Sequence, residues 1–326
     1  MRPYLLSSLA GFFLLAAVIA VVEGVVRSAP VTAYLAERPA DLVTEAGYNA
    51  RLAALSRMEG ERIVVLGDSV GLGQVMANYG LADWQDGELS RALAAERPGA
   101  TISNLSANGL KAADYARTVE DVVALEVDAI VLVLSARAFS SDFDAYDEQH
   151  AHDWRREGFA APLLQARGAA DIVLTDFTGG PLPAVLTGVR ARSQPVPETG
   201  TVDPVSALLF RQRLASAEFD PSEGFQARRL AEALQAAEAA GVALVLVYAT
   251  ENPDLRDQIL PSALRERNFA AMLAFAEQAA PNAPFLGPDP DMSGEHYVDQ
   301  MHPTPDGYRI MARRIAPVLE QELVAR

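Results

Sequence analysis

The chain has 326 residues, of which 50% are hydrophobic, so it can bury one large core or two smaller ones. Its formal net charge of -16 argues against a nucleic-acid partner, because phosphate binding needs clustered Lys and Arg. The absence of Cys excludes disulfides, thiolate catalysis and Cys-ligated zinc. We expect neither a cofactor nor a metal site.

The chain begins with an apolar run. Residues 3–22 carry no charge, and a helix of this length, rising about 1.5 Å per residue, covers the ~30 Å core of a bilayer. Arg2 favours a cytoplasmic amino terminus. We therefore expect residues 1–27 to be a signal anchor, which makes the chain a single-pass protein of the cell inner membrane with its main domain on the periplasmic side. A cleaved signal peptide and a buried core helix are the alternatives.

Residues 28–60 have helical spacing of apolar positions and predict a helical spacer. Strands and helices then alternate, which predicts an α/β fold: a doubly wound, flavodoxin-like, mostly parallel five-stranded sheet in an α/β/α sandwich. The predicted strands are 62–66, 101–105, 129–134, 242–248 and a short one near Phe285. The predicted helices are 70–79, 87–96, 112–125, 225–240 and 261–279.

The first predicted strand ends at Gly67-Asp68-Ser69. A serine at the carboxyl end of a parallel strand that opens a helix meets free backbone N–H groups and the positive end of the helix dipole. The segment fits the Gly-x-Ser-x-Gly pattern of α/β-hydrolases, but a serine after the first strand does not match that fold. Taken alone, Ser69 is better explained as a helix N-cap than as a nucleophile.

The next two strands end at Gly109 and at Ser135-Ala136-Arg137. In a doubly wound sheet Gly109 lies beside the first strand–helix loop, so its N–H can point at a developing oxyanion together with that of Ser69. Arg137 has three alternatives: it is an oxyanion donor, it binds an anionic group of a substrate, or it pairs with nearby acidic residues.

From about residue 139 to 223 the alternation is lost, and we expect an insertion. It contains Glu148, His150, His152 and Asp153, which are metal-ligand residue types. Their spacing fits no standard site, and a solvated acidic loop is the simpler interpretation.

Asp299 lies three residues before His302, just ahead of a helix start at Thr304-Pro305. A serine hydroxyl becomes a nucleophile when an imidazole takes its proton, and a carboxylate fixes the tautomer of that imidazole. His302 alone could simply cap a helix. Together with Ser69, the pair predicts a hydrolytic triad.

With these motifs in order, residues 61–326 resemble the SGNH (GDSL-like) hydrolase family. The resemblance implies Ser69 as nucleophile, His302 as base, Asp299 as orienting acid, and the amides of Ser69 and Gly109 as oxyanion donors. The family has an Asn after the third strand that this chain lacks, so Ser135 and Arg137 are the candidates to replace it. Exported members without that Asn resemble the O-acyl-transfer partners of polytopic membrane acyltransferases.

We therefore expect a membrane-anchored, extracytoplasmic serine esterase or O-acyltransferase. It would act through an acyl-serine intermediate on ester-linked acyl groups, with acetyl groups of envelope glycans as the expected substrate. Its expected partners are the acylated carbohydrate or another ester, the membrane, and a polytopic acyltransferase. The alternative is a catalytically weak or inactive SGNH-fold subunit that binds carbohydrate or assembles with such an acyltransferase.

Overall fold

The computed structural model describes residues 28–37, 45–81, 83–139 and 224–326. The predicted membrane segment at 1–27 and nearly all of the predicted insertion at 139–223 lie outside these residues. Within the described part of the chain, no helix is both long and apolar enough to cross a bilayer.

The chain divides into two compact units. The first takes residues 1–36, 43–58 and 153–190, and its described part is formed by two helices, α2 (Ala29–Glu37) and α3 (Glu45–Leu55), of which Glu37 belongs to the second unit. Both helices lie in the stretch where the sequence predicts helical structure. The second unit holds the central sheet and all the candidate site residues.

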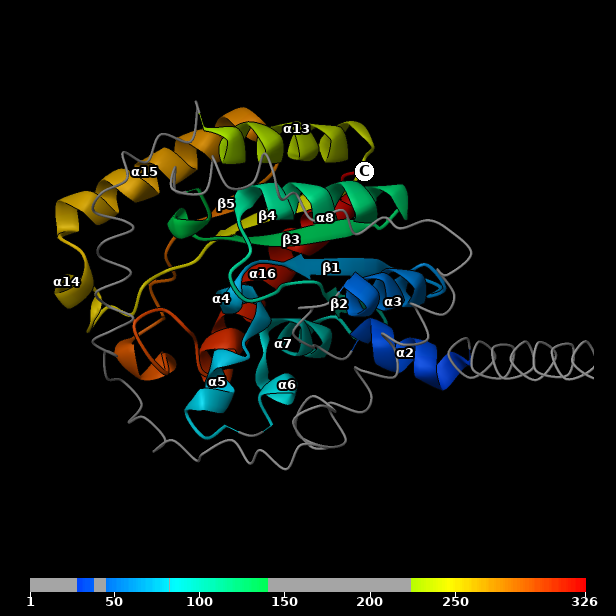
Figure 1. Cartoon of the computed structure of the whole chain (residues 1–326), viewed down its shortest axis with the longest axis horizontal. Helices are drawn as coiled ribbons and strands as arrows, with labels where there is room; N and C mark the ends of the chain where they lie inside the picture. Colours follow the sequence, from blue (N-terminus) through cyan, green and yellow to red (C-terminus); the bar gives the residue numbers. More distant parts are fainter. Residues whose placement is uncertain (1–27, 38–44, 82, 140–223) are drawn as a thin grey trace, which may run out of the picture. The chain divides into compact units, whose positions relative to one another are not determined.

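The sheet of the second unit has five strands in the order β2-β1-β3-β4-β5, and every pair is parallel (Figure 1). The strands are β1 (Arg62–Leu66), β2 (Thr101–Asn104), β3 (Ala129–Leu134), β4 (Ala243–Tyr248) and β5 (Phe285–Leu286). The predicted flavodoxin-like sheet is therefore present. Continuous apolar runs such as β3 form these strands because helices cover both faces of a parallel sheet.

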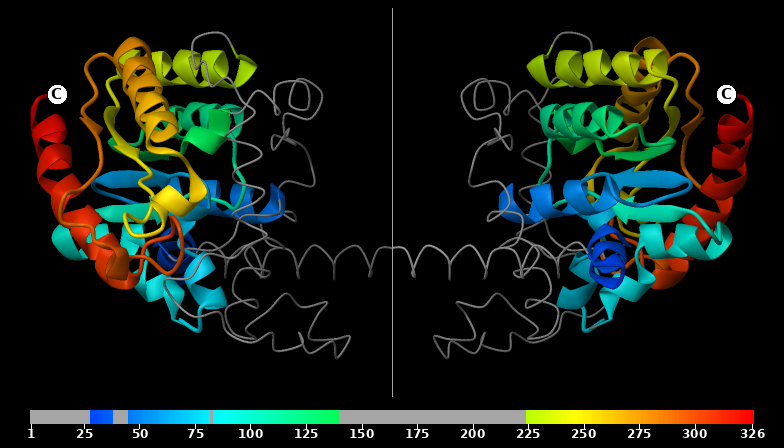
Figure 2. Two further views of the ribbon diagram at one scale, coloured as in Figure 1. Left: turned by 90° about the vertical axis from the view of Figure 1, so that its left-hand side faces the viewer. Right: turned by 90° about the vertical axis from the view of Figure 1, so that its right-hand side faces the viewer.

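Figures 1 and 2 show α8 (Ala112–Ala124), α13 (Phe225–Ala239) and α15 (Ser262–Ala279) on one side of the sheet. The other side carries α7 (Leu89–Glu96) and α16 (Pro305–Val324), which pack on each other. On that side, alternate residues of the strands, such as Ile63 and Val65, form the core with apolar side chains of both helices. Because all strands are parallel, the segments that follow them start at the same edge of the sheet, the edge formed by the carboxyl ends of the strands.

The predicted helix at 70–79 is wrong in one respect, because it breaks into α4 (Ser69–Leu72) and α5 (Val75–Asn78). Gly73 ends α4 with a left-handed φ of 79°. A Cβ on this residue would lie 2.7 Å from the Cβ of Glu88, so the close approach of another segment requires glycine here.

Among the described residues, four further short helices were not predicted: α6 (Trp84–Gly87), α14 (Arg256–Ile259) and the 3₁₀ turns η1 (Ala136–Phe139) and η3 (Gly294–His296). The last helix begins as predicted, since the Thr304 hydroxyl accepts from the Gly307 amide at 3.2 Å and Pro305 takes the first helical position.

Candidate active site

The turn between β1 and α4 is held in one conformation by its neighbours. A Cβ on Gly67 would lie 3.1 Å from the Cβ of Val133 and 3.2 Å from the Cα of Gly71, so β3 leaves no room for a side chain there. The Asp68 carboxylate caps α4 by accepting from the Val70 amide at 2.9 Å. Ser69 then becomes the first residue of the helix, and its side chain is only half-buried.

The segment before α16 is a closed loop. Tyr297 and Pro303 form an antiparallel bridge, and the Val298 amide donates to the His302 carbonyl at 2.8 Å. Inside the loop, Asp299 Oδ1 accepts from the amides of Met301 and His302, each at 2.9 Å. Acid and imidazole are therefore fixed relative to each other by the backbone as well as by their side chains.

The structure brings Ser69, His302 and Asp299 into one hydrogen-bonded chain. His302 Nε2 lies 2.9 Å from Ser69 Oγ, and His302 Nδ1 lies 2.8 Å from Asp299 Oδ2 and 2.9 Å from Oδ1. Two of the three side chains are buried, while that of Ser69 is partly open to solvent. This is the geometry of a serine nucleophile beside an oriented general base.

The electrostatic state of Asp299 suits an orienting role. Burial alone would raise the pKa of its carboxyl group, but the His302 ring and the amides of Met301 and His302 lower it below the usual value. Asp299 is thus an ionised acceptor for the imidazole. A fixed carboxylate leaves Nε2 unprotonated and directed at the serine.

Ser135 is buried under the nucleophile turn. Its hydroxyl donates to Asp68 Oδ2 at 2.7 Å, while the other oxygen of Asp68 accepts from Val70. The sequence predicted Ser135 as a candidate oxyanion or substrate contact, whereas in the structure its one proton is used to hold the carboxylate that caps α4. The partners are distant in sequence, and no local signal reveals this bond.

Gly109 lies in the loop after β2, next to the nucleophile turn. The Ala107 amide donates to the Gly67 carbonyl at 3.3 Å, and the Asn108 side chain donates to that of Gln74. Gly109 itself has a left-handed φ of 76°. The position that a Cβ would take on Gly109 is 3.8 Å from Arg137 Nη2, so the second and third strand ends bring these two predicted site residues together.

Two buried polar residues whose roles the sequence did not reveal, Asn104 and Glu88, support the nucleophile turn. Asn104 Nδ2 donates to the Gly71 carbonyl at 2.9 Å and to Glu88 Oε2 at 2.6 Å. Glu88 is fully buried and caps α7 through the amides of Ser90 and Arg91. Burial raises the pKa of the Glu88 carboxyl above its usual value although its hydrogen bonds oppose the shift.

The last helix also contacts the turn. The hydroxyl of the fully buried Tyr308 in α16 donates to the Val70 carbonyl at 2.6 Å. Because α16 directly follows the loop that carries His302, this hydrogen bond links that loop to the turn that carries Ser69.

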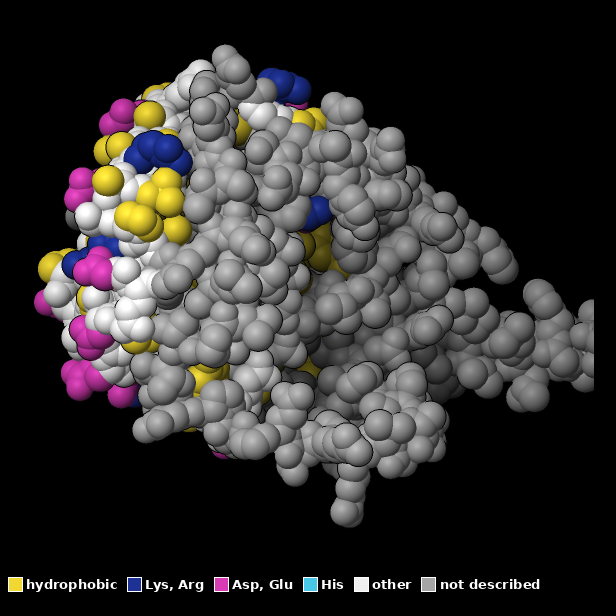
Figure 3. Space-filling view, turned by 60° about the vertical axis from the view of Figure 1, so that its left-hand side comes forward, with side chains coloured by type: hydrophobic (Ala, Val, Ile, Leu, Met, Phe, Trp, Pro, Cys, Tyr) yellow, Lys and Arg dark blue, Asp and Glu magenta, His cyan; other side chains and the backbone are white. Residues whose placement is uncertain are grey.

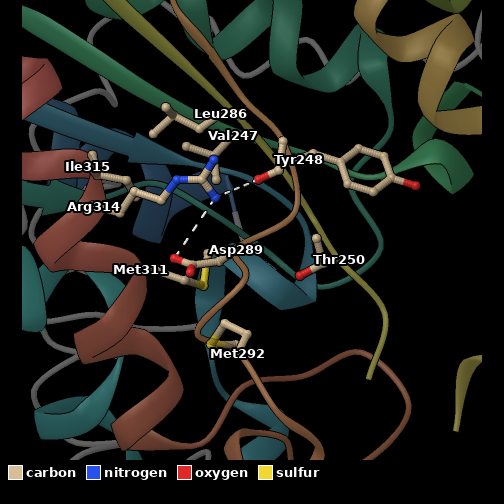
Figure 4. Close-up of a pocket in the computed structure, with 10 residues that line it drawn as sticks. Val247, Tyr248, Thr250, Leu286, Asp289, Met292, Met311, Arg314 and Ile315 are labelled. Carbon is tan, nitrogen blue, oxygen red and sulfur yellow. Dashed lines mark hydrogen bonds and ion pairs between the residues drawn. The ribbon is translucent and has the colours of Figure 1, made fainter. Parts of the chain in front are cut away.

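A separate small pocket lies at the ends of β4 and β5 (Figure 4). Its charged side chains are already paired: Arg314 Nη1 donates to the Gly287 carbonyl at 2.7 Å and lies 3.9 Å from the Asp289 carboxylate. None of the triad residues lines it. On the described surface visible in Figure 3, acidic side chains are interspersed with a few Lys and Arg.

No known protein-family model matches the sequence, and no curated protein sequence matches it. The chain is similar to the solved structure of a candidate acylhydrolase from Bacteroides fragilis, with 11% identity, a TM-score of 0.44, and coverage of 85% of this chain and 95% of that chain. It is also similar to a GDSL-like lipase from Bacteroides thetaiotaomicron, with 13% identity, a TM-score of 0.42, and coverage of 85% and 99%. At these identities and TM-scores, the functional argument rests on the site geometry.

Proposed function

We propose that the chain is a serine-dependent acyl hydrolase of the SGNH type, which cleaves carboxylic esters. The observation that carries this proposal is the continuous hydrogen-bonded chain from Ser69 Oγ through His302 to Asp299. A half-buried serine at the carboxyl edge of a parallel sheet can meet a substrate, while its base is sheltered from water.

In the first half-reaction, Ser69 Oγ attacks the ester carbonyl carbon as His302 Nε2 takes the hydroxyl proton. The resulting tetrahedral oxyanion collapses when its bond to the leaving alcohol breaks and His302 returns the proton to that oxygen. An acyl-serine remains. In the second half-reaction His302 takes a proton from a water molecule as the water oxygen bonds to the acyl carbonyl carbon. The bond between that carbon and Ser69 Oγ then breaks, His302 returns the proton to Oγ, and the acid leaves.

Backbone amides are the oxyanion donors in this proposal. The first amide of a helix has no acceptor within that helix, and Ser69 opens α4. The Gly109 amide belongs to the loop that is hydrogen-bonded to the nucleophile turn. We propose these two groups for the developing negative charge, since preorganised donors of this kind each contribute about 2.7–4 kcal/mol to lowering a barrier.

The cellular setting follows from the amino-terminal run. We propose that residues 1–27 anchor the chain in the inner membrane and that the catalytic unit acts on the periplasmic side. We further propose acetylated envelope glycans as substrates. A sugar hydroxyl in place of water in the second half-reaction would make the same acyl-serine a transfer intermediate, in partnership with a polytopic acyltransferase. The uncharged stretch at 3–22 and the absence of the family's third-motif Asn support this setting.

The test is turnover of p-nitrophenyl acetate by the purified full-length protein, with Ser69→Ala as the matched control. We expect the substitution to abolish turnover above the uncatalysed rate. A fluorophosphonate should label the protein at Ser69, and mass spectrometry locates the adduct. Equal turnover by both proteins and labelling elsewhere would instead indicate a subunit that binds carbohydrate or assembles with another protein.

A further inference from the structure

Arg137 lies beside Gly109, at the carboxyl edge of the sheet. It belongs to η1, directly after β3, and β3 is the neighbour of β1 in the sheet. Its side chain is half-buried, and its Nη2 atom is 3.8 Å from the position that a Cβ would take on Gly109. The guanidinium group is therefore adjacent to one of the two proposed oxyanion donors.

The charge of this guanidinium is not matched by a partner among residues 28–37, 45–81, 83–139 and 224–326. Within the described residues, Arg137 makes no hydrogen bond and no ion pair. In contrast, Arg97 binds both carboxylate oxygens of Glu61, and Arg229 pairs with Glu120 and Glu232. A partly desolvated cation without a partner is unfavourable, so the site gains free energy when an anion binds there.

Two buried polar groups lie near Arg137 in the described part of the chain. The carboxylate of Asp68 already accepts from Val70 and Ser135. Tyr115 is fully buried; burial raises the pKa of its hydroxyl well above its usual value, the charge of Asp68 raises it further, and Arg137 lowers it. Arg137 thus acts on a neutral phenol and lies beside Gly109.

An oxyanion donor must be held in place before the charge develops, because preorganisation is what lowers the barrier. No hydrogen bond from a described residue holds the guanidinium of Arg137. Recognition of a ground-state anion has no such requirement, since the anion itself can order the side chain in a bidentate pair.

We propose that Arg137 binds a carboxylate of the substrate, so that the preferred substrates are esters carrying a negative charge a few atoms from the scissile carbonyl. This inference rests on the proposed acyl hydrolase activity. No bond changes at Arg137; its contact lowers the KM for charged esters and leaves kcat for neutral esters unchanged.

The test compares esters that differ only in charge. One pair, 3-acetoxybenzoate and 3-acetoxybenzamide, places the charge on the alcohol side; the other, mono-(4-nitrophenyl) glutarate and its glutaramate analogue, places it on the acyl side. For at least one pair we expect kcat/KM to favour the carboxylate by about 10- to 100-fold in the wild type. Arg137→Gln should abolish the preference and Arg137→Lys should retain part of it.

The matched control is Arg97→Gln, which removes one positive charge from the residue after α7. Arg97 precedes the amino end of β2, whereas the candidate site lies at the carboxyl ends of the strands. It should keep the preference intact. An equal fall in kcat for charged and neutral esters in Arg137→Gln would make Arg137 an oxyanion donor and overturn the proposal, as would a wild type without charge preference.

A binding measurement separates this inference from the activity on which it rests. In the Ser69→Ala protein, calorimetric titration with the unreactive amide 3-acetamidobenzoate should give tighter binding than 3-acetamidobenzamide, and Arg137→Gln should remove the difference. Loss of Ser69-dependent turnover together with retained carboxylate binding contradicts the proposed hydrolase only. Ser69-dependent turnover without carboxylate preference in either assay contradicts the role of Arg137 only.

Discussion

At the scale of single residues, the two carboxylates that position the triad and the nucleophile turn have their oxygens hydrogen-bonded before a substrate arrives. One oxygen of Asp299 accepts from two amides and also contacts the imidazole. Asp68 divides its oxygens between a helix cap and Ser135. Buried polar groups cost free energy unless they are paired, so these bonds fix the rotamers on which the nucleophile depends.

Ser135 offers a direct measure of that support. We expect Ser135→Ala to lower the free energy of unfolding by about 1–3 kcal/mol, because it leaves one buried oxygen of Asp68 without its donor. We also expect a lower kcat, since Asp68 then holds the turn before Ser69 less firmly. Urea denaturation and ester turnover measure the two effects.

The control is Ser103→Ala. Ser103 is equally buried, but its hydroxyl has no hydrogen-bond partner within the described chain. Removing it should change stability and kcat little. Similar losses in both variants would show that the Ser135–Asp68 bond is not what stabilises the turn.

At the scale of secondary-structure elements, the nucleophile turn is short and depends on neighbouring elements. Helix α4 has a single turn, which is too short to be stable alone. Asn104 at the end of β2 binds its Gly71 carbonyl, and Tyr308 of α16 binds its Val70 carbonyl. The position of Ser69 therefore depends on elements from both ends of the catalytic unit.

Gly73, which ends α4, allows the Glu88 side chain to pack closely against the nucleophile turn. Alanine at this position is strained by the left-handed φ of 79° and also brings its Cβ within 2.7 Å of the Glu88 Cβ. We expect Gly73→Ala to destabilise the protein by about 3 kcal/mol or more, combining backbone strain with a clash, and to reduce turnover. Thermal or urea denaturation measures the loss.

Gly241 provides a matched comparison, because it has the same φ of 79° and a Cβ there would meet nothing within 4 Å. Gly241→Ala should cost only the backbone strain, about 1 kcal/mol. If the two alanine variants lose the same stability, the contact with Glu88 is not the reason that Gly73 is a glycine.

Because burial raises the pKa of Glu88, which caps α7, we expect the free energy of unfolding to depend on pH. Its folded-state pKa is raised by burial, so the folded protein keeps this proton to a higher pH than the unfolded chain does. The stabilising contribution is therefore complete below the unfolded pKa of about 4.3 and is lost as pH rises through the folded pKa. The Ser90 hydroxyl donates to Glu88 Oε1 at 2.6 Å and opposes part of this shift.

Glu88→Gln removes this titration. We expect the variant to be less stable than the wild type at low pH by about 1–3 kcal/mol, because an amide cannot accept from all the donors around Glu88. The difference should shrink as pH rises from 4 toward 8. Urea denaturation across this range measures it, and parallel pH curves for both proteins would contradict the prediction.

The elements themselves were largely predictable from the sequence. The apolar run at 129–134 is β3 to the residue, because a strand buried on both faces has to be apolar throughout. The break at Gly73 was not predictable, since its cause is a contact with Glu88, and the interruption has no local signal beyond the glycine itself. The Ser135–Asp68 and Asn104–Glu88 bonds likewise join residues that only the tertiary fold brings together.

At the scale of the whole molecule, topology explains why two motifs at opposite ends of the sequence meet. In the order β2-β1-β3-β4-β5, the strand after β1 in the sequence, β2, lies on one side of β1, and the next strand, β3, lies on its other side. The strand order therefore reverses at β1, and a crevice forms there at the carboxyl ends of the strands. Ser69, Gly109 and Arg137 follow β1, β2 and β3 in turn. The loop before α16 adds His302 to the same edge, at 2.9 Å from Ser69.

The proposed membrane anchor concerns the entire chain and can be tested directly. If the uncharged residues 3–22 anchor the chain as proposed, we expect the full-length protein to stay in the membrane fraction after an alkaline carbonate wash. A variant lacking residues 2–27 should move to the soluble fraction. Leu14→Arg places a charge near the middle of the run at a cost of about 2.5–3.5 kcal/mol and should weaken insertion. Intact-mass measurement separates an anchor from a cleaved signal peptide, and a full-length protein that washes off with its amino terminus intact would contradict the anchor.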